Sequence, residues 1–98
     1  MHLKHVVYFF ILFFYIPVWA QTEKTAIDFY NKGVEYFNAK NFELALASYS
    51  ACIEKDPLYV KAYYNRGNCE LNLQQFDSAV ADFDKTISLD PSFVKALL

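Results

Sequence analysis

The chain has little glycine, little proline and, after its first five residues, no histidine. The two glycines, Gly33 and Gly67, stand far apart, so the sequence contains no Gly-rich loop that could cradle a phosphate. With His2 and His5 confined to the N-terminus, Ser-His-Asp and Cys-His catalysis are excluded, and the commonest side-chain ligand of transition metals is missing. We therefore expect no catalytic residues, no enzyme activity, no cofactor, no metal site and no small-molecule substrate.

Three further absences narrow the class of protein. Neither a period-two alternation of apolar residues nor a hairpin dipeptide occurs, so strands are not expected. Nine Lys+Arg against eleven Asp+Glu leave a net charge of −2 without a basic stripe, which argues against nucleic-acid binding. Cys52 and Cys69 are too far apart in sequence for a zinc-ribbon pair. They pack as small apolar side chains or, in an oxidising compartment, form a disulfide, and we prefer the packing interpretation.

Residues 1–20 have the layout of a secretory signal peptide. A short basic start is followed by an unbroken apolar run over 6–16 and by Pro17, and small residues stand one and three places before Gln21. We expect cleavage after Ala20 and export to the periplasm or the extracellular space. The apolar run is shorter than the roughly 20 residues of a membrane span. An uncleaved leader that anchors the chain to a membrane is the alternative, and membrane contact is expected only in that case.

The most informative pattern in the chain is an internal repeat with a period of 34 residues. The identical pairs are Tyr30 and Tyr64, Asn31 and Asn65, Gly33 and Gly67, Phe42 and Phe76, Ala45 and Ala79, Ala47 and Ala81, Ile53 and Ile87, Asp56 and Asp90, Pro57 and Pro91, and Val60-Lys61-Ala62 and Val94-Lys95-Ala96. A fixed period of this length is typical of stacked-repeat architectures. We divide the chain into a first repeat at 26–59, a second at 60–93, and the start of a third at 94–98.

Each copy contains two runs of helical apolar spacing separated by a short polar turn. Thr22 or Thr25 is expected to cap the first helix and Asn41 the second, which should stop near Lys55 because the residue before Pro57 disfavours helical geometry. The sequence therefore predicts an all-α fold of antiparallel helix pairs.

Both glycines fall inside predicted helices, where glycine costs up to about 1 kcal/mol relative to alanine. Their recurrence at equivalent positions predicts close approach of a neighbouring helix. We expect Ala45 to be the partner of Gly33, and Ala79 the partner of Gly67.

At these positions the chain resembles a tetratricopeptide repeat. The resemblance rests on aromatic residues, glycine, alanine and proline in the family's order, at Phe29, Gly33, Tyr36, Ala45, Tyr49 and Pro57 in the first copy and at Tyr63, Gly67, Ala79, Phe83 and Pro91 in the second. Lys32 and Arg66 replace a common leucine, and we expect their stems to cover apolar surface while the charges reach water. Glu70 replaces an aromatic residue, and Lys40 and Gln74 stand where a turn glycine is common.

The resemblance implies an α-solenoid whose first helices line a concave groove for a peptide or protein segment. Carried over to this sequence, the candidate peptide-contacting residues of the groove are Tyr30, Asn31, Val34, Asn38, Lys61, Tyr64, Asn65, Asn68, Asn72 and Lys95, and Ile27, Phe37 and Leu71 face the same groove. Asparagine offers a donor and an acceptor to a peptide backbone, and tyrosine offers a large contact area. The alternative interpretation is that these residues form ordinary solvated helix faces.

The predicted function is therefore that of a protein–protein interaction module. A second hypothesis makes the chain the N-terminal segment of a longer solenoid whose activity lies beyond Leu98. Because each repeat buries its apolar face only against a neighbour, we also expect self-association through the apolar C-terminal end.

Overall fold

The structure is a computed structural model that describes Pro17 and residues 23–97. The predicted leader, Pro17 apart, and its cleavage site lie outside the described residues. The described part contains the helices α2 (Ala26–Asn38), α3 (Phe42–Lys55), α4 (Val60–Asn72), α5 (Phe76–Leu89) and α6 (Pro91–Leu97). Strands do not occur in this part of the chain. None of its helices is both long and apolar enough to cross a membrane.

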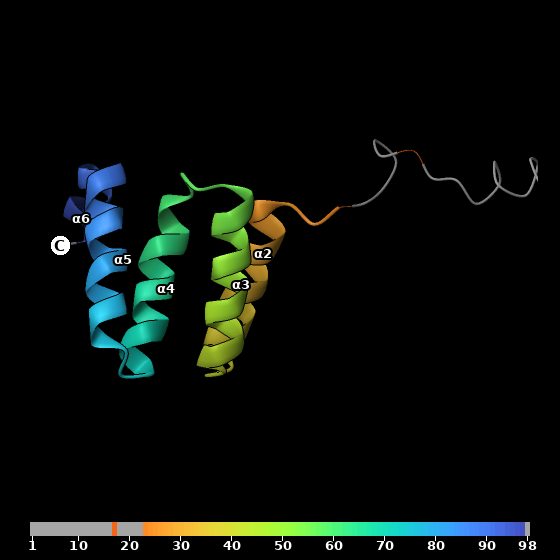
Figure 1. Cartoon of the computed structure of the whole chain (residues 1–98), viewed down its shortest axis with the longest axis horizontal. Coiled ribbons are helices and arrows are strands. Elements are labelled where there is room, and N and C mark those ends of the chain that lie inside the picture. Colours follow the sequence, from red (N-terminus) through yellow and green to blue (C-terminus); the bar gives the residue numbers. More distant parts are fainter. Residues whose placement is uncertain (1–16, 18–22, 98) are drawn as a thin grey trace, which may run out of the picture.

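Each helix packs against the next one along the chain. In Figure 1, α2 and α3 form one antiparallel pair, α4 and α5 form the second, and α6 rests on α5. The predicted all-α fold of packed helix pairs is confirmed.

Side-chain caps mark the starts of α2 and α3. The Thr25 hydroxyl accepts a hydrogen bond from the Asp28 amide at 3.4 Å, and the Asp28 carboxylate accepts one from the Thr25 amide at 2.9 Å, which completes a capping box on α2. The Asn41 carbonyl oxygen accepts from the Leu44 amide at the start of α3. The second helix ends at Lys55, as predicted.

Each helix pair is joined by a turn whose central residue is left-handed although it is not glycine. Lys40 and Gln74 both have a φ of 60°. At the first turn, the Lys40 amide donates to the Phe37 carbonyl at 2.9 Å and the Asn41 amide donates to the Tyr36 carbonyl at 2.9 Å. This Schellman arrangement satisfies the free carbonyls at the end of α2. The same pair of bonds closes α4 around Gln74.

The two helical glycines accommodate aromatic rings. A Cβ atom on Gly33 would lie 2.5 Å from Cε1 of Tyr49, and one on Gly67 would lie 2.7 Å from Cε1 of Phe83. The predicted close approach is therefore confirmed, and the atoms nearest to each glycine belong to an aromatic ring. The predicted partners Ala45 and Ala79 are buried on the helices that carry these rings.

The core centres on Ala45, Tyr49 and Cys69, with Tyr30, Val34, Tyr36, Phe37 and Leu46 packed around them. Cys52 and Cys69 are both buried and free, which agrees with the packing interpretation. Burial raises the pKa of each thiol to about 11.

The two repeats differ in how well their second helices are covered. Phe76, Val80 and Ile87 of α5 are 47–59% exposed. Their equivalents in α3, Phe42, Leu46 and Ile53, are half-buried, and α3 is covered by α4. The apolar face of α5 is therefore more open than that of α3.

Candidate functional site

A cavity of about 250 Å³ lies where α2, α3 and α4 meet. Its lining residues are Tyr30, Val34, Phe37 and Asn38 from α2, Tyr49 from α3, and Asn65 and Asn68 from α4. The structure thus brings five of the ten predicted groove residues together at one hollow: Tyr30, Val34, Asn38, Asn65 and Asn68.

One hydrogen bond across the two repeats fixes part of this lining. The Asn65 side-chain amide donates to the Tyr30 hydroxyl at 3.1 Å. The Tyr30 ring is in turn held between the rings of Tyr49 and Tyr59, with centroid distances of 5.8 and 5.1 Å. Burial raises the pKa of the Tyr49 phenol, so this side chain stays neutral. The first helices of the two repeats are therefore held side by side at the cavity.

The cavity combines an apolar wall with accessible amides. Val34 and Phe37 provide apolar surface, while Asn38 is exposed and Asn68 is half-buried. An asparagine side chain offers two donors and an acceptor. The lining lacks carboxylates, thiols and ammonium groups. This arrangement suits binding of a side chain and its adjoining peptide bonds, and it offers no acid–base pair.

The other predicted groove residues lie away from this cavity. Asn31, Lys61 and Lys95 are exposed and do not line it. The Tyr64 ring is half-buried and packs against Phe83 and Phe93, with centroid distances of 5.8 and 5.6 Å.

Asn72 also lies outside the lining. Its side-chain amide donates to the main-chain carbonyl of Asn68 at 2.9 Å. Tyr64 thus packs between helices, and Asn72 supports the backbone that carries Asn68.

A larger hollow of about 430 Å³ lies on a different face of α2, against α3. Its lining residues are Lys24, Asp28, Phe29, Lys32, Tyr36, Leu44, Ala47, Ser48 and Ala51. In the second repeat, Arg66 stands in register with Lys32 and contacts α3 of the preceding repeat. This hollow therefore occupies the face on which repeats stack, so we place the candidate site at the smaller cavity between the first helices.

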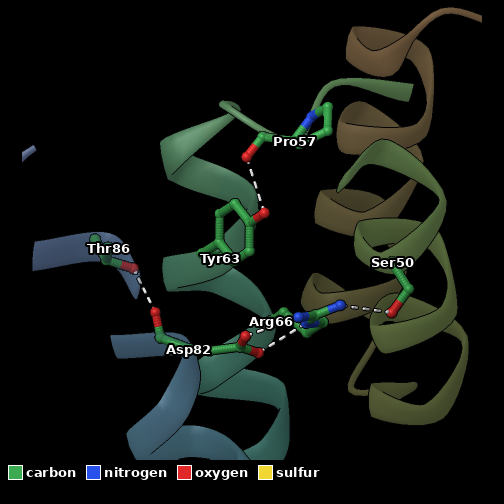
Figure 2. Close-up of polar contacts among 6 residues, drawn as sticks. All are labelled: Ser50, Pro57, Tyr63, Arg66, Asp82 and Thr86. Carbon is green, nitrogen blue, oxygen red and sulfur yellow. Dashed lines mark hydrogen bonds and ion pairs between the residues drawn. The ribbon is translucent and has the colours of Figure 1, made fainter. Parts of the chain in front are cut away.

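A partly buried ion pair that the sequence did not predict lies within the second repeat, and its arginine also contacts the first repeat (Figure 2). Arg66 contacts both carboxylate oxygens of Asp82 at 2.7 Å, and its third nitrogen donates to the Ser50 hydroxyl of α3 at 3.3 Å. Hydrogen bonding to Asp82 raises the pKa of Arg66. We expected the Arg66 charge to reach water. Its side chain is 24% exposed, and its guanidinium group is paired with Asp82, which is 5% exposed.

Two signals in the sequence could have revealed this pair. Asp82 shares the buried face of α5 with Ala79 and Thr86, at helical spacings of three and four residues. An acidic residue on such a face requires a partner, and Arg66 stands at a position where the repeat pattern favours leucine. No cluster of potential metal ligands is found within residues 23–97 or at Pro17.

Comparison with known proteins is consistent with this geometry. Family models of the tetratricopeptide repeat match residues 29–57 and 60–93, which together make up more than half of the chain. No curated protein matches the chain.

Proposed function

Because the chain belongs to the tetratricopeptide repeat family, we propose that it is a protein–protein interaction module that holds an extended partner segment in the cavity between α2 and α4. Scaffolds of this family are typically non-catalytic. The observation that carries the proposal is the Asn65–Tyr30 hydrogen bond, which joins the two first helices beside an open, asparagine-lined hollow.

The size and chemistry of the cavity favour a peptide over a small molecule. Its volume of about 250 Å³ lies below the roughly 300–1,000 Å³ of small-molecule sites. One apolar side chain of a partner would fit between Val34 and Phe37. The peptide bonds on either side would then exchange hydrogen bonds with Asn38 and Asn68, so the main chain provides affinity and the pocket provides selectivity.

Selection from a library of random linear peptides tests this proposal. The recovered peptides are titrated calorimetrically against the wild-type chain, Asn68→Ala and the control Asp84→Ala, an exposed position on α5. Losing one or two peptide hydrogen bonds is worth about 1–2 kcal/mol, so Asn68→Ala should weaken binding about tenfold while the control binds like the wild type. Equal affinity of all three proteins, or no recovered peptide, would count against the cavity as the binding site.

We also propose that the protein acts outside the cytoplasm and that its leader is removed. The support is the basic, apolar and small-residue layout of residues 1–20. N-terminal sequencing of the exported product tests this proposal. A start at Gln21 is expected, whereas a start at Met1 on a membrane-bound product would favour the anchored alternative.

A further inference from the structure

The most unusual polar group in the described part of the chain is the carboxyl group of Glu70. The residue is 6% exposed, and its Oε1 atom is buried without a hydrogen-bond partner. At the equivalent position of the first repeat stands Tyr36, an aromatic residue packed against the core. A carboxyl group in such a slot is costly when it is ionised and much less costly when it is neutral.

The neighbours of Glu70 explain which form the fold favours. From α5, Asp82 presents a second carboxylate; from α4 itself, Arg66 and the Cys69 thiol lie nearby. The preceding helix α3 contributes the neutral hydroxyl of Ser50, which Arg66 contacts. Arg66 already engages both oxygens of Asp82, so a single guanidinium would face two carboxylates if Glu70 were also ionised.

We propose that Glu70 is a proton-operated latch inside the second repeat: its neutral carboxyl completes the buried cluster with Asp82, and its ionisation loosens α4 from α5. Ionisation of Glu70 also weakens the hydrogen bond from Arg66 to Ser50 of the first repeat, because two carboxylates then compete for one guanidinium group. The latch thus acts on the residues that join the second repeat to the first, independently of whether the cavity binds a peptide.

Removal from water, with a smaller contribution from the Asp82 carboxylate, raises the pKa of Glu70 to about 8. In the unfolded chain this group has an ordinary pKa of 4.5. Between pH 4.5 and about pH 8, Glu70 is protonated in the folded chain and ionised in the unfolded chain. The contribution of this proton to the free energy of unfolding is therefore complete below pH 4.5 and is lost progressively up to about pH 8. The unfolding equilibrium constant should increase up to about tenfold per pH unit across this window and level off above it.

Glu70→Gln is the informative variant because it keeps the shape of the side chain and cannot ionise. Unfolding of the full chain by urea is measured from pH 4.5 to pH 9 for the wild type, Glu70→Gln and the control Glu54→Gln, an exposed position on α3. The wild type and Glu54→Gln should show the same pH dependence, and Glu70→Gln should lack the loss of stability between pH 5 and pH 8. Parallel curves for all three proteins would overturn the proposal.

Two measurements keep the proposal testable if Glu70→Gln does not fold. Carbon-detected NMR of the wild type follows the Glu70 carboxyl directly, and a titration midpoint near 8 is expected, whereas a midpoint near 4.5 would refute the latch. Hydrogen exchange then tests the loosening. After correction for intrinsic exchange, protection of the α4 and α5 amides should fall several-fold between pH 6 and pH 9, and unchanged protection would exclude the proposed opening.

Discussion

Replacing Gly33 with alanine tests the packing that brings the two helices of the first repeat together. In an exposed helix, this change gains up to about 1 kcal/mol of stability. Here the new methyl group would lie 2.5, 2.7 and 2.8 Å from three ring atoms of Tyr49, whereas carbon atoms pack best at about 3.5–4.0 Å. The ring is 1% exposed and lies between Gly33 and the core, so it has little room to move away.

The expected outcome is a net loss of stability. Overpacking a filled core costs about 1–3 kcal/mol against a propensity gain of up to about 1 kcal/mol, so Gly33→Ala should destabilise the chain by up to roughly 2 kcal/mol. Gly67→Ala is the matched comparison. It meets Phe83 at 2.7 Å, but that ring is half-buried and has more freedom to shift, so its cost should be smaller.

Urea unfolding at constant pH measures both variants, and a double-mutant cycle assigns the cause. Tyr49→Leu removes the ring that Gly33→Ala would contact, so the two changes should couple by about 1 kcal/mol or more when combined. A Gly33→Ala variant that is more stable than the wild type by the full propensity gain, or additive effects in the cycle, would refute the packing argument.

The remaining predictions concern the turns, the cysteines and the open face of α5. Lys40→Gly and Gln74→Gly should each stabilise the chain by about 0.5–1 kcal/mol in urea unfolding, because glycine adopts the left-handed conformation without the cost that an L-residue bears; a loss of stability would contradict this. At pH 8, Cys52 and Cys69 should react with a thiol reagent at least about a hundredfold more slowly in the folded chain than in denaturant, since burial keeps them protonated, and equal rates would contradict their burial. We expect the exposed apolar face of α5, which includes Val80, to take part in self-association, so Val80→Lys should reduce concentration-dependent association measured by sedimentation; an unchanged sedimentation profile would contradict this role of the face.

The sequence predicted the helix pairs well because the signals that define them are local. A capping threonine, a capping asparagine and a proline after Asp56 fix helix ends through neighbouring atoms. Because the sequence pattern recurs after 34 residues, the same helix pair was predicted in both repeats. The recurrence of Gly33 and Gly67 correctly indicated intimate contact between helices, although it did not identify the ring that fills the space.

The details of the site depended on contacts between distant segments, which local patterns do not determine. The Tyr64 ring contacts Phe83 and Phe93, which are the repeat equivalents of the two rings that contact Tyr30. Only Tyr30 lines the cavity, where Asn65 of the following repeat donates to it. The pairing of Asp82 with Arg66 depends on the packing of α5 against α4, and it was not predicted. Repeat equivalence therefore predicts where a residue sits on its helix, while its neighbours decide whether it binds, pairs or packs.

NMR mapping of a peptide selected on the intact chain tests the central claim most directly. If α2 and α4 form the binding surface, the side-chain amide signals of Asn38, Asn65 and Asn68 should shift on titration, together with the methyl signals of Val34. Shifts confined to the hollow around Phe29 between α2 and α3, or to the exposed face of α5, would contradict the assignment of the cavity as the binding site.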